Sequence, residues 1–344
     1  MPKKILIVIE DAYSYAGTEN VCNFMTTCFT NCKIKLVSLK GNGKPFYPFI
    51  NVDEIISLNY SKRKWVDYKK IENEFNPDFI FVVSMGKLSV IFCIKNIICN
   101  FNSRKKYIAC EHISFDSFSY SVKLLKILFL RFYNKVIVLT KRDESKLSSY
   151  GINSECISNP VFFRNYKRKD RNRIALAVGR LEFQKGFDIL IDIWSEFVAH
   201  NKTWKLFIIG EGSMRSMLEA KISTLNLQDY VVLIGLSTEI DKYYKEADVL
   251  LSTSRYEGLP MVMLEAKAWS MPIISFDCPT GPRELISDGY DGYLIKLNDK
   301  KRYLKCLELI DNDKNYFSLV DNVEETVKEL EALNIKNKWQ RLLD

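Results

Sequence analysis

The chain has 344 residues, and 47 % of them are hydrophobic, enough apolar material for two domains of ordinary size. Nine scattered cysteines without a Cys-x-x-Cys pair, together with only two histidines, argue against a zinc site or a disulfide framework and fit a reducing compartment. The N-terminus resembles a buried strand more than a signal peptide, and no apolar run approaches the roughly 18 residues of a membrane span. We therefore expect a cytoplasmic protein.

The first half alternates apolar strands with amphipathic helices, which predicts a parallel, doubly wound α/β sheet. The predicted strands are KILIVI, KIKLVSL, DFIFVVSM, KKYIAC and KVIVLT, and the predicted helices cover 18–30, 87–99, 120–133 and the residues from 141. Ligands of such sheets bind at the carboxyl ends of the strands, so the loops after Ile9, Met85 and Cys110 are the candidates.

Two residues in these loops are notable. Gly17 opens the first helix, where a glycine lets backbone approach a ligand closely, although helix capping alone explains it. His112 follows the strand KKYIAC, and a histidine in that position is ordinarily a surface residue. Taken alone, neither residue establishes a site.

Positive charge is concentrated in the first half. Residues 1–165 carry 24 Lys and Arg against 14 Asp and Glu, and the remainder carries 26 against 28. A solvated basic surface, an anionic membrane or acceptor, and nucleic acid would each fit, but no recognition motif supports nucleic acid. Taken alone, the cationic, apolar helix containing Lys123 and Lys126 is better explained as a core helix with snorkelling lysines, because a doubly wound sheet needs a helix there. Together with the cluster Lys62–Trp65 it suggests a peripheral, anionic membrane surface.

Residues 162–173 are rich in charge and predict a solvated linker between domains at 1–165 and 166–344. The second half repeats the alternation of strands and helices. Arg180 and Lys185 lie just past its first strand, where both can reach a diphosphate, although surface salt bridges are the simpler interpretation. No Gly-x-Gly-x-x-Gly is present, which disfavours a dinucleotide-dependent oxidoreductase.

The stretch LSTSRYEGLPMVMLEAKA, residues 251–268, predicts a strand, a tight turn and a helix. Pro260 suits the first helical position, so the N–H groups of residues 261–263 should form an anion site at the helix start. Glu257 lies at that start and Glu265 about two turns along. They could be a cap and a solvent-facing residue, or they could both contact one polar ligand.

The spacing of these two glutamates, within E-G-x-P-x-x-x-x-E-A, resembles the signature of the family 4 retaining glycosyltransferases of bacterial surface-polysaccharide synthesis. The resemblance extends from residue 5 to about residue 300. It implies the GT-B architecture, in which two doubly wound, Rossmann-like domains face a central cleft. The N-terminal domain would bind the acceptor and the C-terminal domain the nucleotide sugar, and the last helix, about 330–344, would pack back on the first domain through Trp339.

The resemblance also implies roles for individual residues. Glu257 would face the donor sugar, Glu265 would hold the ribose, and His112 would touch the donor sugar. The family's usual Gly-Gly-x-Glu loop has Ala16 in place of its first glycine here. The donor-binding residues would be Gly17, Arg180, Lys185, Gly258, Leu259, Met261, Val262 and Glu265.

We therefore expect a retaining hexosyltransferase that moves a hexose or N-acetylhexosamine from a nucleoside-diphosphate sugar, with UDP favoured, to a glycan or lipid-linked glycan in lipopolysaccharide or capsule synthesis. Arg180, Lys185 and the helix start would neutralise the diphosphate, so no metal or other cofactor is expected. The Asp-x-Asp at 311–313 resembles a helix boundary. A sugar-nucleotide epimerase and a non-catalytic glycan- or partner-binding protein of the same fold are the alternatives.

Overall fold

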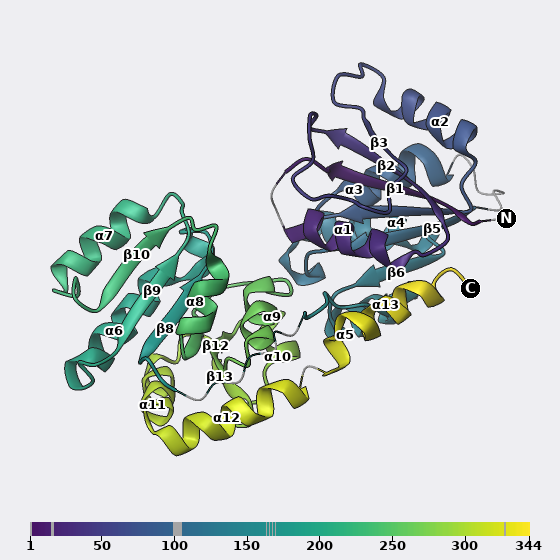
Figure 1. Cartoon of the computed structure of the whole chain (residues 1–344). Coiled ribbons are helices and arrows are strands. Elements are labelled where there is room, and N and C mark those ends of the chain that lie inside the picture. Colours follow the sequence, from purple (N-terminus) through teal and green to yellow (C-terminus); the bar gives the residue numbers. More distant parts are fainter. Residues whose placement is uncertain are drawn as a thin grey trace. The chain divides into compact units, whose positions relative to one another are not determined.

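The computed structural model describes residues 2–14, 17–98, 105–162, 164, 166, 168, 170–326 and 328–344. The chain forms two compact units (Figure 1). Unit 1 contains Met1–Asn159 and Leu333–Asp344, and unit 2 contains Pro160–Ala332. The chain therefore passes between units after Asn159, a few residues before the boundary that composition suggests.

Unit 1 contains a seven-stranded sheet in the order β3-β2-β1-β4-β5-β6-β7, in which every pair is parallel. Its strands are β1 (Lys4–Asp11), β2 (Lys33–Lys40), β3 (Glu54–Ser57), β4 (Phe79–Ser84), β5 (Lys106–Glu111), β6 (Lys135–Val138) and β7 (Ser154–Cys156). The strand order reverses between β1 and β4. The carboxyl ends of these strands are therefore the switch point where ligands of such sheets bind.

Both faces of this sheet are covered, because alternate residues of each strand point to opposite sides. Leu6 and Val8 of β1 join one core cluster, and Ile5 and Ile7 join the other. Helices packed on the first face are α2 (Lys64–Phe75), α3 (Leu88–Phe92), the π-helix η1 (Cys93–Ile97), η4 (Leu130–Phe132) and α5 (Lys141–Ser149). Short η3 (Phe115–Ser117) and α4 (Tyr120–Phe129) lie between β5 and η4 in the chain.

The second face is covered by α1 (Gly17–Cys28) and by the C-terminal helix α13 (Ala332–Arg341). Trp339 of α13 is 2 % exposed and packs edge-on against Phe29 and Phe81. The last helix of the chain is therefore part of the core of unit 1.

Unit 2 contains a six-stranded parallel sheet in the order β10-β9-β8-β11-β12-β13. Its strands are β8 (Ile174–Val178), β9 (Lys205–Ile209), β10 (Val231–Gly235), β11 (Val249–Ser252), β12 (Ile273–Asp277) and β13 (Gly292–Lys296). Its helices are η5 (Phe183–Lys185), α6 (Phe187–His200), α7 (Arg215–Thr224), α8 (Ile240–Glu246), α9 (Met261–Ala268), α10 (Pro282–Leu285), α11 (Lys300–Asp311), α12 (Asp313–Thr326) and η6 (Lys328–Leu330). The switch point of this sheet lies between β8 and β11.

The expected solvated linker is wrong for Arg168 and Arg171, although Arg164 is exposed. Arg168 is 6 % exposed and donates hydrogen bonds to the carbonyl oxygens of Tyr244, Ala247 and Trp269. Arg171 lies over the ring of Tyr316, with its guanidinium carbon 4.3 Å from the ring centre. Guanidinium groups with several fixed donors suit buried carbonyl oxygens, so this segment is anchored to unit 2.

Two further expectations concern α11, α12 and the membrane. The Asp-x-Asp at 311–313 is a helix boundary, as predicted, since α11 ends and α12 begins there. Asp311 accepts a hydrogen bond from the Trp204 indole at 2.7 Å, which gives this carboxylate a structural role. No helix in the described part of the chain is both long and apolar enough to cross a bilayer.

Candidate functional site

The switch point of the unit 2 sheet brings together the two residues that the sequence singles out most strongly. Lys185 ends η5, which follows β8, and Glu257 follows β11. The Nζ of Lys185 lies 2.6 Å from Oε1 of Glu257. The carboxyl ends of β8 and β11 are thus bridged by an ion pair between two largely buried side chains, at the place where ligands of such sheets bind.

A glycine allows these two loops to approach each other. Gly186 has φ of 67°, and a Cβ there would lie 2.1 Å from the carbonyl oxygen of Thr253. The hydroxyl of Thr253 donates to the carbonyl of Gly186 at 2.8 Å. Only glycine fits this contact, which places Lys185 beside Glu257.

The carboxylate of Glu257 is fixed from more than one side. Its Oε1 accepts a second hydrogen bond, from the hydroxyl of Ser254 at 2.7 Å. The hydroxyl of Thr280 donates to the backbone carbonyl of Glu257. Glu257 is 7 % exposed, so it is a charged group held in one orientation in a partly dry environment.

The helix start beside Glu257 differs in detail from the prediction. α9 begins at Met261, and Pro260 is the N-cap with φ of −72° and ψ of 111°. The carbonyl of Pro260 accepts a hydrogen bond from the N–H of Met263 at 3.0 Å, so this N–H is not available to a ligand. Met261 and Val262 are the first two residues of α9. Proline suits the N-cap as well as the first helical position, because in both places it has no N–H that would be left unpaired.

Gly258 and Leu259 lie between Glu257 and this helix, in a loop that closely contacts the one after β12. A Cβ at Gly281, where φ is 93°, would lie 2.0 Å from the carbonyl oxygen of Gly258. Leu259 is buried, at 7 % exposure. The segment that follows Cys278 therefore supports the turn that carries Glu257, rather than forming an independent site.

Glu265 lies on α9, and its side chain has a partner of its own. The hydroxyl of Tyr244, from α8, donates to Oε2 of Glu265 at 2.7 Å. Burial raises the pKa of the Glu265 carboxyl above its ordinary value, and the Tyr244 hydrogen bond opposes that shift. Tyr244 is 1 % exposed, and burial beside Glu265 raises the pKa of its phenol well above the usual range.

Sequence reasoning identified neither Tyr244 nor Ser254. Ser254 lies three residues before Glu257 inside the quoted stretch, so its proximity could have indicated the contact. Tyr244 lies 21 residues before Glu265 on another helix, and no spacing rule connects the two positions.

Arg180 lies at the end of β8 and is exposed, with Nη2 3.4 Å from the side-chain oxygen of Gln184. Its long side chain is therefore close to the switch point but is not held as Lys185 is. The neighbouring strand ends are joined by hydrogen bonds from Gly179 to Ile209 and from Gly210 to Gly235.

In unit 1, the candidate residues lie at the carboxyl ends of β1 and β5. Gly17 is the first residue of α1, whereas Ala16 lies outside the described residues. Glu19, in the first turn of α1, is 7 % exposed, and its Oε2 has no hydrogen-bond partner in the described part of the chain. Burial raises the pKa of Glu19.

His112 follows β5 directly. Its backbone N–H donates to the carbonyl of Ser84 at 2.9 Å, and its ring Nε2 is buried without a hydrogen-bond partner among the described residues. Burial lowers the pKa of His112 to about 4, so the imidazole is neutral at neutral pH. A neutral imidazole can donate a hydrogen bond to a sugar hydroxyl through one ring nitrogen or accept one through the other.

The residue before it, Glu111, forms an ion pair with Lys126 at 2.5 Å. Lys126 is fully buried and also lies 3.3 Å from the hydroxyl of Ser89. The prediction that Lys126 faces a membrane is therefore wrong, because a buried carboxylate from β5 draws its ammonium group into the core.

Across the described residues, no group of three or more His, Cys, Asp or Glu side chains is arranged to hold a metal ion. The charged groups described at the unit 2 switch point are one carboxylate, one ammonium and one nearby guanidinium, and the first turn of α9 follows the carboxylate. That set suits an anionic ligand that also carries hydroxyl groups.

Comparison with known proteins is consistent with this geometry. Residues 158–329 match the family model described as glycosyl transferases group 1. The chain is 34 % identical, over 85 % of its length and 85 % of the relative's, to the amylovoran biosynthesis glycosyltransferase AmsD of Erwinia amylovora.

A second relative, from Campylobacter jejuni, is 26 % identical over 88 % of this chain and 87 % of its own. It is an α-1,4-N-acetyl-D-galactosaminyltransferase whose name specifies a glycan on PP-undecaprenol. Among solved structures, Anabaena HepE in complex with UDP has a TM-score of 0.82 with 17 % identity, and 99 % of each chain is covered. This structural similarity supports the two-domain GT-B fold predicted from the sequence.

Proposed function

The chain belongs to the group 1 glycosyltransferases, and on that premise we propose that it transfers a hexose or N-acetylhexosamine from a nucleoside-diphosphate sugar to a glycan acceptor, with retention. The observation that carries this proposal is the Lys185–Glu257 pair at the switch point of the unit 2 sheet. An ammonium group has three donors, so Lys185 can hold Glu257 and still donate to a phosphate oxygen.

The leaving group of such a reaction is a nucleoside diphosphate, on which negative charge grows as the bond to the sugar breaks. Lys185, Arg180 and the first turn of α9 at Met261 and Val262 would stabilise that charge, and Gly17 would contribute backbone from unit 1. Fixed donors aimed at developing charge are an effective catalytic device because they need no reorganisation during the reaction. We propose that they balance the diphosphate without a metal ion.

Glu257 would orient the sugar hydroxyls and stabilise positive charge near the anomeric carbon. For retention, the bond from C1 to the phosphate oxygen breaks while the acceptor oxygen bonds C1 on the same face. The acceptor proton passes to the departing β-phosphate oxygen. Glu265 would hold the ribose hydroxyls, and His112 would exchange a hydrogen bond with the donor sugar.

UDP is our choice of nucleotide because HepE, which shares the fold, was solved with UDP. A surface glycan is our choice of product, because AmsD acts in amylovoran biosynthesis and the Campylobacter relative acts on a glycan carried by PP-undecaprenol. An acceptor attached to such a lipid would place the enzyme peripherally at the inner face of an anionic membrane.

The test is to incubate the full chain with UDP-glucose, UDP-galactose, UDP-N-acetylglucosamine and UDP-N-acetylgalactosamine, and to follow UDP release with and without glycan acceptors. Proton NMR of the product reads the anomeric configuration, and Glu257→Gln is the control for adventitious hydrolysis. Release that depends on acceptor, with retention and in the presence of EDTA, is expected. Inversion at C2 without transfer would indicate an epimerase, and the absence of any turnover would indicate a binding protein. A strict requirement for Mn²⁺ or Mg²⁺ would refute the metal-free scheme.

A further inference from the structure

The outer surface of unit 1 carries a group of large apolar side chains that the fold does not cover. Six of them, which we call the apolar ridge, are each 42–55 % exposed. The apolar ridge consists of Ile91 on α3, Ile94 on η1, Ile98 directly after η1, and Leu124, Leu125 and Leu128 on α4. Contiguous exposed apolar surface of this kind marks an interaction site more often than single exposed leucines do.

The two halves of the ridge are neighbours. α3 packs beside α4, and η1 packs beside η4. The inward sides of these helices carry Leu88, Phe92, Ile97 and Leu130, which belong to the core cluster on one face of the sheet. The ridge residues recur at helical spacing on the opposite side of the same helices, so they point away from the sheet.

The charges on the helices that carry the ridge are of one sign. Between Asp78 and Glu111 the chain contains no acidic residue, and residues 117–134 contain none. Lys87 and Lys95 flank the isoleucines, and Arg131 follows the leucines; all three are exposed. Lys87 and Lys95 make no ion pair within the described part of the chain. Apolar side chains with cations at their margin suit the interface of a bilayer that carries anionic headgroups.

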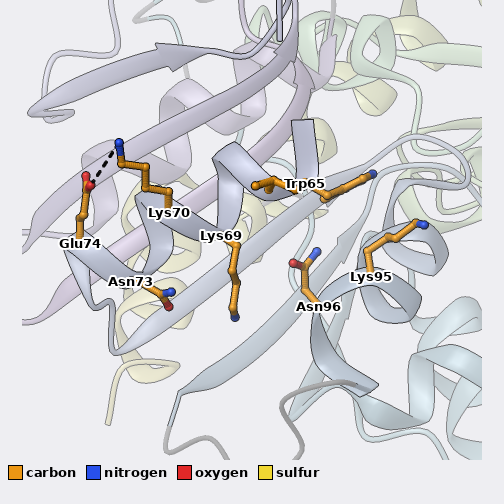
Figure 2. A pocket seen from close by; sticks show the side chains of 8 residues that line it. Trp65, Lys69, Lys70, Asn73, Glu74, Lys95 and Asn96 are labelled. Carbon is orange, nitrogen blue, oxygen red and sulfur yellow. Dashed lines mark ion pairs between the residues drawn. The ribbon is translucent and has the colours of Figure 1, made fainter. Parts of the chain in front are cut away.

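A pocket of about 700 Å³ adjoins the isoleucine side of the ridge, between α2 and η1 (Figure 2). Its lining combines the indole of Trp65 with three ammonium groups, from Lys69, Lys70 and Lys95. Lys69 pairs with Glu72 at 2.9 Å and Lys70 with Glu74 at 3.9 Å, which leaves Lys95 as the cation of the three with no acidic partner in the described residues. Tryptophan and lysine side chains of this kind are typical of the headgroup level of a membrane.

We propose that the apolar ridge inserts into the acyl boundary of an anionic lipid bilayer, with Lys87, Lys95 and Arg131 at the phosphate level and the Trp65 pocket receiving a lipid headgroup. This assigns a surface to the membrane partner of the proposed function. It also moves the contact away from the cations Lys62, Arg63 and Lys64 and from the buried Lys126, which the sequence favours. A second copy of the chain fits the ridge poorly, because a two-fold contact would set these cations against one another.

The experiment measures sedimentation of the full chain with vesicles of phosphatidylcholine alone and of equal parts phosphatidylcholine and phosphatidylglycerol, over a series of salt concentrations. The ridge variant is Ile91→Ser, Ile94→Ser, Leu124→Ser and Leu128→Ser, and its control is Phe46→Ser with Ile50→Ser, which are exposed in the same unit. The rim variant is Lys87→Gln, Lys95→Gln and Arg131→Gln, and its control is Lys62→Gln with Arg63→Gln. Thermal unfolding confirms that each variant is folded.

Wild type should bind the anionic vesicles at low salt. The partition coefficient of the ridge variant should be lower by roughly tenfold or more, and both control variants should bind as wild type does. The rim variant should lose most of its salt dependence. Unchanged activity of the ridge variant on a soluble acceptor separates this proposal from the transferase proposal. Wild type that ignores the vesicles would overturn it, as would a ridge variant that still binds them fully. Loss of a dimer in the ridge variant, with vesicle binding intact, would assign the ridge to a second copy.

Discussion

The two units differ in how they treat the polar groups at the carboxyl ends of their strands. In unit 2, Glu257 accepts from Lys185 and Ser254, and Glu265 accepts from Tyr244. In unit 1, His112 Nε2, Glu19 Oε2 and Glu111 Oε1 are buried without a hydrogen-bond partner in the described chain.

An unsatisfied buried polar group costs about 1 to 3 kcal/mol, so such groups persist where something else compensates for them. The unit 2 residues are held in place before any ligand arrives, which is what a site that must stabilise developing charge requires. Each of the unit 1 residues keeps one unpaired polar atom in the described chain, although Lys126 holds the other oxygen of Glu111, so a ligand that reaches such an atom can complete its hydrogen bond. Substitutions at the two sets should therefore have different signatures.

The largest effect is expected from Lys185→Ala. The change removes a diphosphate donor and leaves the carboxylate of Glu257 buried without its cation, so kcat/KM should fall roughly a hundredfold or more. Steady-state UDP release measures the change. Lys300→Ala, which removes a surface pair with Asp192 in the same unit, is the matched control and should retain wild-type rates. Near-normal activity of Lys185→Ala would break the assignment of the site.

Glu257→Gln and Glu265→Gln should separate the two carboxylates. A charge-assisted hydrogen bond contributes about 1.5 to 3 kcal/mol, so changes of roughly ten- to hundredfold are expected in each. Glu257→Gln should lower mainly kcat, and Glu265→Gln should mainly weaken donor binding, as seen by calorimetry with UDP. If both variants behave like wild type, neither carboxylate has the role we give it.

His112 provides a stability test in unit 1. Its pKa is about 4 in the folded chain and near 6.5 when unfolded, so the unfolded chain binds more protons between these values. The free energy of unfolding should be highest above pH 6.5 and decrease by about 2 to 3 kcal/mol as the pH falls toward 4.5. Urea unfolding at several pH values tests this. His112→Gln should flatten that part of the pH dependence, and the exposed variant His200→Gln should leave it unchanged.

The smallest effect is expected from Tyr244→Phe. The phenol touches Glu265 rather than a proposed reacting atom, so it acts as a positioning residue. A net hydrogen bond of about 0.5 to 1.5 kcal/mol predicts UDP binding weakened roughly two- to tenfold, with kcat little changed. If the loss appears in kcat and not in UDP affinity, Tyr244 does not act through Glu265. If the two residues act together, the double variant Tyr244→Phe with Glu265→Gln should bind UDP no more weakly than Glu265→Gln alone.

Much of this architecture can be predicted from local pattern. Runs such as KILIVI are buried on both faces, and their alternation with helices indicates parallel sheets before any contact is known. The turn Glu257–Pro260 and the helix after it are also local, so Glu257 and Glu265 could be located by spacing. The one-residue error at Pro260 reflects that a proline fits the N-cap and the first helical turn equally well.

The sequence alone thus determined the two alternating α/β halves, the motif around Glu257 and the family resemblance, because these depend on neighbours in the chain. Only the tertiary structure decided which charges are buried. Lys126 lies in the core because Glu111 is there, and Arg168 is buried because three carbonyls of unit 2 converge on it. A charge leaves water only where distant elements bring it a partner, and no spacing along the chain encodes that meeting.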